Sequence, residues 1–304
     1  MSNPRVTKLR YIGLAGPDFA TERNFLKDPW SLHEVAADGD LAYFRAEGSS
    51  EKFVTRLRGA EKRGIDVIGF AADSAGDVDA LAAKLGKDGV KLISEPHRLD
   101  SPGGGYGFRF FDLDGHAVEV SSDVAPGPSR ALDRGESVPS ELSHVVLHTP
   151  DIKKAVAFYQ DKLGFRVSDW LGDFMCFVRC NEVHHSLAFL PGPPALNHVA
   201  YEMRDLDEMM RGAGRLMKAK VPLKWGPGRH VAGNNTFSYF HDPIGNTLEY
   251  TAEVERVNDA SWQATVYPPG PDITDQWGTS VLSDGPTKMG HPTPDPYLWQ
   301  APPV

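Results

Sequence analysis

Two histidines and one glutamate in the second half of the chain have the residue types of a transition-metal site. His144 lies in Ser-His-Val-Val-Leu, His198 opens His-Val-Ala-Tyr, and Glu249 ends the motif Asp-x-x-Gly-x-x-x-Glu. Two imidazoles and one carboxylate that leave part of the coordination sphere open are the ligand set of non-haem Fe(II) oxygenases. We therefore interpret these residues as a candidate Fe(II) site. Mn(II) stays open as the alternative, because such ligands do not separate the two ions by sequence.

The first half of the chain repeats the sequence around these residues but lacks both histidines. The corresponding positions are Tyr11, Val67 and Glu119. A duplicated fold thus tolerates a tyrosine and a valine at these places, so histidines at both places in one copy need a chemical reason. The glutamate is present in both copies, which indicates that this position also has a structural use, such as pairing with a nearby donor.

The segments that carry these residues predict repeated β-α-β-β-β modules. Apolar runs predict the opening strands, helical spacing predicts the helix behind each, and alternation predicts two strands around each Asp-x-x-Gly turn. The expected opening strands are 8–15, 66–72, 142–149 and 197–203, and the expected helices are 18–28, 76–85, 151–162 and 205–218. We therefore expect an α+β fold in which four βαβββ modules pair into two half-open barrel domains. The ligand strands would line the inside of the second barrel.

Composition divides the 304 residues into two domains, a linker and a tail. Residues 1–123 form the expected first domain, without metal, and residues 141–255 the expected catalytic, metal-binding domain. The linker, 124–140, is rich in Pro, Gly and Ser. The tail, 256–304, combines many prolines with several aromatic residues. We expect this tail to pack on the body of the protein or on a neighbouring subunit.

Charge and hydropathy exclude several classes of function. A net charge of −9 without a basic run argues against nucleic-acid binding. No apolar stretch is long enough to cross a bilayer, and the first residues lack the apolar segment of a signal peptide. The cysteines, Cys176 and Cys180, lie too far apart along one predicted strand for a disulfide. We expect a cytoplasmic protein with reduced cysteines, and a homo-oligomer.

The stretch 228–249 resembles the signature of type I extradiol ring-cleaving dioxygenases of the vicinal oxygen chelate superfamily, which include catechol 2,3-dioxygenases and 2,3-dihydroxybiphenyl 1,2-dioxygenases. The matching residues are Gly228, His230, Tyr239, Asp242, Pro243, Gly245 and Glu249. The chain departs from the signature at Ser238, where the family usually has an apolar residue. The run His-His-Ser-Leu-Ala-Phe at 184–189 also resembles the active-site strand of the family. The resemblance extends over residues 6–255, including a first domain without metal.

The resemblance implies a role for each candidate residue. The two histidines and the glutamate named first would hold Fe(II), and His185 would lie beside the site of the co-substrate O2. His230 and Tyr239 would contact the hydroxyl oxygens of a small aromatic diol. Because neighbours on a strand face opposite sides, His184 and His185 are not both expected to point inward, and the resemblance selects His185. The substrate-pocket candidates are Val146, Trp170, Phe174 and Phe177.

The implied activity is extradiol, or meta, cleavage in aromatic degradation. Both atoms of O2 would enter a catechol-type ring and give a muconic semialdehyde-type product. The alternatives on the same fold are a glyoxalase-type isomerase or thiol transferase, and a binding protein without catalysis. Glyoxalase sites use four protein ligands, and the first half offers no fourth; binding modules typically lack the three ligands. Which catechol is cleaved stays open among one-ring, biphenyl, fused-ring and hydroquinone-type diols.

Overall fold

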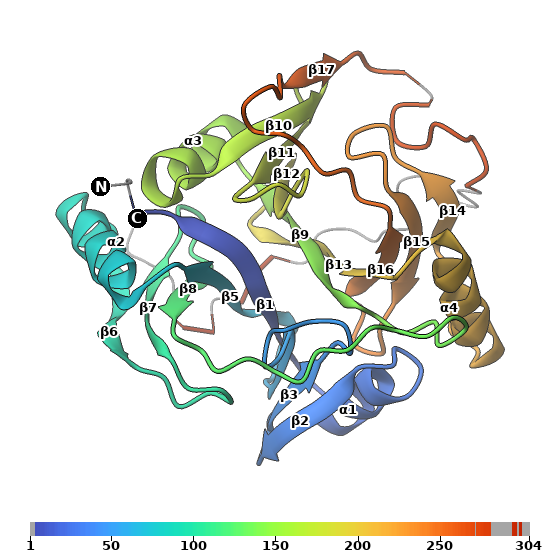
Figure 1. Cartoon of the computed structure of the whole chain (residues 1–304), viewed down its shortest axis with the longest axis horizontal. Helices are drawn as coiled ribbons and strands as arrows, with labels where there is room; N and C mark the ends of the chain where they lie inside the picture. The colour runs from blue at the N-terminus through green and yellow to red at the C-terminus, as the bar shows by residue number, and fades with distance from the viewer. Residues whose placement is uncertain (1–3, 271, 281–293, 297, 300–304) are drawn as a thin grey trace.

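The computed structural model describes residues 4–270, 272–280, 294–296 and 298–299, and it folds each half of the chain around one curved sheet (Figure 1). The strands of the first sheet lie in the order β2-β3-β4-β1-β5-β8-β7-β6. Its elements are β1 (Val6–Gly16), α1 (Phe19–Lys27), β2 (His33–Asp38), β3 (Leu41–Arg45), β4 (Thr55–Gly59), β5 (Gly64–Ala72), α2 (Ala75–Lys87), β6 (Leu92–Arg98), β7 (Tyr106–Phe111) and β8 (Ala117–Ser122).

The second sheet repeats this plan and adds one strand from the tail. Its order is β14-β15-β16-β13-β9-β12-β11-β10-β17. Its elements are β9 (Glu141–Thr149), α3 (Ile152–Leu163), β10 (Arg166–Leu171), β11 (Met175–Arg179), β12 (Leu187–Pro191), β13 (Ala195–Glu202), α4 (Leu206–Lys218), β14 (Trp225–Arg229), β15 (Thr236–His241), β16 (Thr247–Ala252) and β17 (Thr265–Tyr267). The predicted α+β fold of four βαβββ modules is confirmed.

Strand register supports the alignment of the two halves. In the first sheet Val67 pairs with the residue two places after Tyr11, and in the second sheet His198 pairs with the residue two places after His144. The parallel pairs agree as well, since Glu119 lies opposite Gly69 and Glu249 lies opposite Ala200. The three positions therefore have the same neighbours in both sheets.

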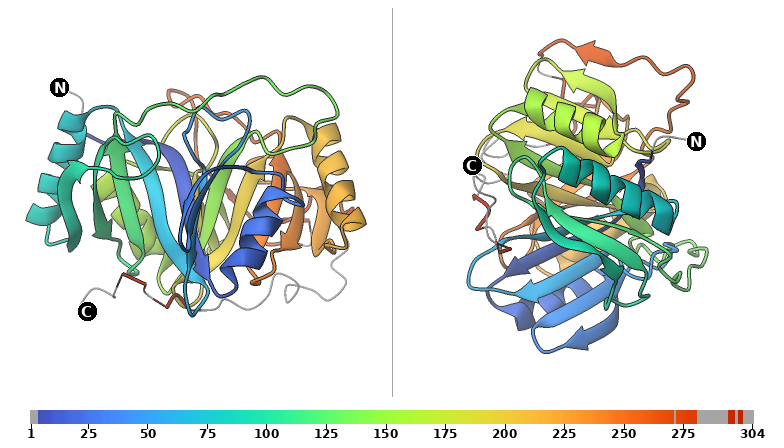
Figure 2. Two further views of the ribbon diagram at one scale, coloured as in Figure 1. Left: turned by 90° about the horizontal axis from the view of Figure 1, so that it is seen from below. Right: turned by 90° about the vertical axis from the view of Figure 1, so that its left-hand side faces the viewer.

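The four helices lie on the outer faces of the two sheets and begin at side-chain caps (Figures 1 and 2). The capping side chains accept a hydrogen bond from the backbone N–H three residues later, which satisfies a donor that the first turn leaves free. The caps are Asp18, Ser74, Asp151 and Asp205. No helix in the described ranges is long and apolar enough to cross a membrane.

The two sheets share one hydrophobic core, and buried polar contacts join the halves. Tyr159 of α3 donates to Asp112, in the turn between β7 and β8, at 2.8 Å. Tyr250 of β16 donates to the Trp30 carbonyl at 2.7 Å, and the two rings stack with centroids 4.1 Å apart. Buried residues of both halves belong to this one core. The second sheet is therefore packed against residues of the first half.

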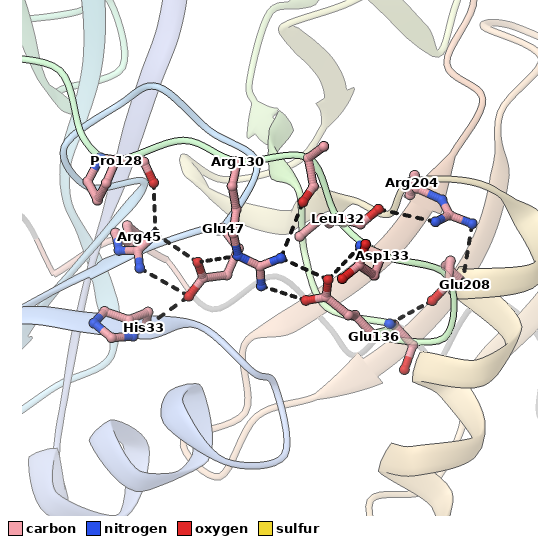
Figure 3. Close-up of polar contacts among 12 residues, drawn as sticks. His33, Arg45, Glu47, Pro128, Arg130, Leu132, Asp133, Glu136, Arg204 and Glu208 are labelled. Carbon is pink, nitrogen blue, oxygen red and sulfur yellow. Dashed lines mark hydrogen bonds and ion pairs between the residues drawn. The ribbon is translucent and has the colours of Figure 1, made fainter.

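The connection between the halves is held to both of them by ion pairs and backbone contacts (Figure 3). Arg130 pairs with Glu136 at 2.5 Å and with Glu47 of the first half at 3.4 Å. On the other side, both carboxylate oxygens of Glu208 in α4 accept backbone N–H groups, of Gly135 at 2.5 Å and Ser137 at 2.6 Å. The Pro- and Gly-rich segment thus takes one defined path along both sheets (Figure 2).

The described parts of the tail pack on the body of the same chain. β17 pairs in parallel with β10 and extends the second sheet. Farther along, Asp295 accepts the backbone N–H of Ile65 at 3.1 Å, and the Trp299 indole donates to the Asp66 carbonyl at 2.6 Å. The Trp299 ring lies against the Arg109 guanidinium, 4.9 Å from ring centroid to Cζ, within the first half. The tail therefore contacts both sheets.

Candidate metal centre and active-site cavity

His144, His198 and Glu249 converge at the centre of the second sheet. They lie on β9, β13 and β16, which are direct neighbours in the strand order. Their ligand atoms all lie within 4.8 Å of one another. Nε2 of each histidine is 3.2 Å from Oε2 of Glu249, and all three side chains are buried. The structure thus brings together three residues that are far apart in sequence.

The unpaired atoms of this group fit a divalent metal ion. Within the described residues, Nε2 of His198 and both carboxylate oxygens of Glu249 are buried without a hydrogen-bond partner. Buried polar groups are seldom left so, because the loss of water is then uncompensated. Two imidazole nitrogens and a carboxylate that point at one place are suitable ligands for Fe(II), Mn(II) or a similar ion.

The residue before each histidine fixes which imidazole nitrogen faces the centre. Ser143 Oγ lies 3.0 Å from Nδ1 of His144, and Asn197 Oδ1 lies 2.6 Å from Nδ1 of His198. Because an amide oxygen only accepts, Nδ1 of His198 carries the proton and Nε2 keeps its lone pair for a metal. A polar residue directly before each histidine is the sequence signal for this arrangement, and the sequence analysis did not use it.

His148 extends this hydrogen-bonded chain, although the sequence did not single it out. Its Nε2 lies 2.8 Å from the amide nitrogen of Asn197, and its Nδ1 lies 3.0 Å from the Pro191 carbonyl oxygen. The carbonyl accepts from Nδ1–H, so Nε2 accepts from the amide of Asn197. Asn197 is thereby oriented with its oxygen toward His198. His148 supports a ligand from a position that also lines the cavity.

Burial and mutual charge favour the deprotonated forms of Glu249 and His198. Burial acts to raise the pKa of Glu249, but His144 and His198 outweigh it, and the pKa lies well below its usual value. Burial lowers the pKa of His198 to about 4, even though the Glu249 carboxylate opposes that shift. Deprotonated imidazole and carboxylate are the forms that bind a metal.

His185, His230 and Tyr239 surround this group, as the resemblance implies. The ring of His185 lies 4.1 Å from that of His144, and the ring of Tyr239 lies 5.1 Å from that of His198, centroid to centroid. Nε2 of His230 lies 3.0 Å from the Tyr239 hydroxyl. Burial lowers the pKa of both histidines below its usual value and raises that of Tyr239. All three are therefore neutral groups near neutral pH.

Of the adjacent histidines His184 and His185, only His185 lines the cavity. Both are buried, with Nδ1 of one ring 3.0 Å from Nδ1 of the other. The two residues precede β12, which begins at Leu187, so the alternation of a regular strand does not apply to them. His185 lines the cavity, while His184 lies behind it against Asp169.

A cavity of about 330 Å³ opens over the three converging residues. Val146, Phe174 and Phe177 line it, as expected from the sequence. Trp170 does not line it and packs against the main hydrophobic core, because its neighbour Leu171 occupies the inward face of β10. The other lining side chains are His144, His148, Met175, His185, Leu190, Asn197, His198, Trp225, His230, Ala232, Tyr239, Ile273 and Thr274.

The same positions in the first sheet form a closed, paired arrangement. Arg109 Nε donates to Glu119 at 2.8 Å, which is the pairing expected for the retained glutamate. Arg109 lies opposite Glu119 in the strand register, as Tyr239 lies opposite Glu249. Tyr11 and Val67 fill the remaining space, and the nearby cavity holds only about 10 Å³. The guanidinium of Arg109 thus pairs with the carboxylate that would otherwise be available to a metal.

Comparisons with known proteins extend over both halves of the chain. The family described as "Glyoxalase/Bleomycin resistance protein/Dioxygenase superfamily" matches residues 28–120 and 141–250. "Metapyrocatechase 2" of Cupriavidus necator is 30% identical over 298 residues, which cover 91% of this chain and 90% of that protein. The "Iron-dependent extradiol dioxygenase" of Rhodococcus jostii (strain RHA1) is 26% identical, with 85% and 93% covered.

A solved structure is similar over nearly its whole length. It is described as the Mn(II)-bound glyoxalase from Novosphingobium aromaticivorans, with 53% sequence identity and a TM-score of 0.94. The alignment covers 98% of each chain. The similarity therefore includes both sheets.

Proposed function

Since the chain belongs to the glyoxalase/bleomycin resistance protein/dioxygenase superfamily, we propose that it is an extradiol ring-cleaving dioxygenase. The reaction would insert both atoms of O2 into a catechol-type diol and give a muconic semialdehyde-type product. The observation that carries this proposal is the placement of His185, His230 and Tyr239 around the three converging ligand residues in one cavity. The names of the curated relatives support it.

His144, His198 and Glu249 would hold a divalent metal, for which we propose Fe(II), with Mn(II) as the alternative. One relative is described as iron-dependent, and the similar solved structure as Mn(II)-bound. When bound, the metal would bring the diol and O2 together and allow electron density to pass from the ring to O2. The single carboxylate leaves such a site with one net positive charge, which suits a diol that binds as a monoanion.

His230 and Tyr239 form the proton-handling side of the cavity. Nδ1 of His230 lies 2.7 Å from the Thr274 carbonyl oxygen, so this nitrogen carries the proton. Nε2 of His230 then accepts from the Tyr239 hydroxyl at 3.0 Å. A diol hydroxyl beside Tyr239 can therefore pass its proton toward Nε2 of His230, directly or through the tyrosine oxygen. Tyr239 and His230 would hold this proton until the product needs it.

The cavity wall favours an uncharged diol with an apolar substituent. Apart from its histidines, the wall consists of aromatic and aliphatic side chains with one asparagine and one threonine. Among the described residues that line it, none is Lys, Arg, Asp or Glu. A carboxylate on the substrate would lose its water there without gaining a cation. The volume of about 330 Å³ lies at the lower end of small-molecule sites, which suits a one- or two-ring compound.

The test is oxygen uptake by the purified protein after anaerobic loading with Fe(II) or, separately, Mn(II). A panel of catechols with alkyl, aryl and carboxylate substituents is offered, and absorbance is followed for a yellow product. Stoichiometric O2 consumption with yellow colour supports the proposal, and a preference for apolar substituents supports the proposed substrate class. No uptake by either metal-loaded form, with metal content verified, contradicts it.

A glyoxalase-type isomerase is the second candidate, because the 53% identical structure carries that description. Such an enzyme would act on the adduct of a thiol and a 2-oxoaldehyde and would consume no O2. Glyoxalase-type sites use four protein ligands, whereas three residues converge in the described part of this chain. Isomerase or thiol-transferase turnover without oxygen uptake, measured with the same metal-loaded protein, would favour this candidate.

We also propose that the protein acts in the cytoplasm and assembles as a homo-oligomer. Both cysteines are buried and free, which suits a reducing compartment. The surface that would form between subunits is not assigned, and light scattering of the purified protein measures the assembly directly. A monomer at all concentrations would contradict the second part of this proposal.

A further inference from the structure

A chain of three buried polar side chains leads to the cavity from behind. Oδ2 of Asp169, on β10, lies 2.9 Å from Nε2 of His184, and Nδ1 of His184 lies 3.0 Å from Nδ1 of His185. The other Asp169 oxygen accepts the backbone N–H of Thr265, in β17, at 2.7 Å. Asp169, His184 and His185 are 1%, 0% and 2% exposed. Neither Asp169 nor His184 lines the cavity, and buried polar groups of this kind are costly unless fully hydrogen-bonded.

We propose that Asp169 and His184 are positioning residues that fix the ring and the tautomer of His185. His185 would then turn an unprotonated Nε2 toward the cavity. The consequence for turnover rests on the proposed dioxygenase function, whereas the tautomer itself can be observed without any reaction.

The direction of the hydrogen bonds follows from which atoms can donate. An ionised carboxylate only accepts hydrogen bonds, so Nε2 of His184 carries a proton and donates it in a hydrogen bond to Asp169. A neutral imidazole has one donor and one acceptor nitrogen, which leaves Nδ1 of His184 as an acceptor. Nδ1 of His185 must then donate to it, and the lone pair of His185 is left on Nε2. The carboxylate thereby determines the tautomer of an imidazole with which it has no contact.

Surrounding residues pack closely against both rings. A Cβ added to Gly233 would lie 3.1 Å from Nδ1 of His184 and 3.2 Å from Cε1 of His185, so the rings fill the space beside this glycine. The Phe177 ring lies edge-on to His185, at 5.1 Å between centroids, and the Trp262 ring lies edge-on to His184, at 5.7 Å. The backbone N–H of His184 donates to the Glu255 carbonyl at 2.8 Å. The ring orientation is therefore set by packing as well as by hydrogen bonds.

The tautomer decides what His185 offers to a bound molecule. With the lone pair on Nε2, His185 accepts a hydrogen bond from a hydroxyl or another polar hydrogen in the cavity. With the proton on Nε2 it would donate instead, and the Nδ1 contact with His184 would place two lone pairs against each other. Such partners of functional histidines typically change activity or metal affinity by about 10- to 100-fold when removed.

The first test observes the tautomer by nitrogen NMR of the full chain. The protein is labelled with ¹⁵N-histidine and loaded with Zn(II), which is diamagnetic and accepts the same ligand types. The His185 signals are identified by their absence in the His185→Asn variant. The proposal expects a protonated Nδ1 and an unprotonated Nε2 in the wild type. A proton on Nε2 of His185 would overturn it.

The second test compares variants that keep or lose the direction of the hydrogen bonds that run from His185 through His184 to Asp169. Gln at 184 can accept from His185 through its oxygen and donate to Asp169 through its nitrogen, so His184→Gln should retain the tautomer. His184→Leu and Asp169→Asn should yield mixed tautomers and lower kcat by about 10- to 100-fold, while KM changes little. Unchanged tautomer and kcat in both of these variants would contradict the proposal.

Asp112→Asn provides a matched control. This aspartate also pairs with a buried histidine, His116, at 3.1 Å, but in the first half of the chain. Its replacement should leave the His185 tautomer and kcat unchanged, even if the protein becomes less stable. If the wild type cleaves no catechol, the NMR result still decides between the two tautomers, so the two proposals can fail independently.

Discussion

In the first sheet Arg109 forms an ion pair with Glu119. In the second sheet the equivalent residue is the uncharged Tyr239, and two histidines lie beside Glu249 instead. The strands, their order and the register around these positions are equivalent in both sheets. The two sheets differ in the charged groups that lie beside this glutamate. A guanidinium built into the first barrel neutralises the buried carboxylate permanently. Among the described residues no such group lies beside Glu249, so the charge of this carboxylate would be balanced by protons or a metal. The residue opposite the glutamate therefore differs between the copies, since Arg109 forms an ion pair with Glu119 and Tyr239 brings no charge to Glu249.

Removal of one ligand should produce the largest difference between the two sheets. His198→Ala leaves two ligands, so we expect loss of bound metal and of all ring-cleaving activity. Val67→Ala makes a similar truncation at the equivalent position of the first sheet and should leave both unchanged. Metal content by mass spectrometry and oxygen uptake measure the two effects. A His198→Ala protein with full metal and full turnover would refute the ligand assignment.

Removal of a hydroxyl should separate catalysis from packing. Tyr239→Phe keeps the ring but removes the O–H that His230 accepts, and kcat should fall by about 10²- to 10⁴-fold. Tyr11→Phe removes a buried hydroxyl beside the equivalent glutamate and should leave kcat within about twofold, because no proton transfer passes through it. Equal losses in the two variants would show that the tyrosine acts only through stability.

Loss of the guanidinium should reveal how much the first sheet depends on its ion pair. Arg109→Ala leaves Glu119 buried without its partner, and the free energy of unfolding should fall by about 3 to 5 kcal/mol in urea titrations. Because Trp299 packs on the same guanidinium, its fluorescence should change as well. The double variant Arg109→Met with Glu119→Gln removes both charges and should recover most of the loss. No recovery would mean that packing, rather than charge, is what Arg109 provides.

Two buried carboxyl groups that lie near residues of the other half, Glu22 beside Asp242 and Asp112 beside Tyr159, should respond oppositely to pH. Burial and the charge of Asp242 raise the pKa of Glu22 above its ordinary value of 4.5. The unfolded chain therefore releases this proton before the folded one, and stability should fall as pH rises above about 4.5. Glu22→Gln should remove this slope and give a more stable protein at pH 9, by about 1.4 kcal/mol for each pH unit between the unfolded pKa and the pH of the measurement.

The equivalent contact at Asp112 serves as the reference. Burial acts to raise its pKa, but His116 and Tyr159 outweigh that, and the pKa lies below its ordinary value of 3.8. Its contribution is therefore present near neutral pH and is lost in acid. Urea titrations between about pH 2 and pH 4 measure the Asp112 slope, and titrations between about pH 5 and pH 9 measure the Glu22 slope. A Glu22→Gln protein with the wild-type slope would place the responsible proton elsewhere.

The ligand residues were predictable because the duplication supplied a comparison within one sequence. Strand positions follow from apolar alternation, and the register then carries His144, His198 and Glu249 to one place. The buried position of His184 behind the cavity was not predictable, because this residue lies where strand alternation stops. Trp170 was assigned to the wrong face of β10, since a strand with apolar residues on both sides does not show which side is the cavity. Ile273 and Thr274 come from a tail whose path depends on distant contacts.

That tail joins the two sheets in a way that bears on how such molecules evolve. It contributes Ile273 and Thr274 to the cavity of the second sheet and places Trp299 in the barrel of the first. The copy without the two ligand histidines therefore still has a structural role. Because the first copy need not admit substrate and O2, the Trp299 indole can occupy a place where the second copy must keep an opening. A substitution in the tail can therefore affect the packing of both copies at once.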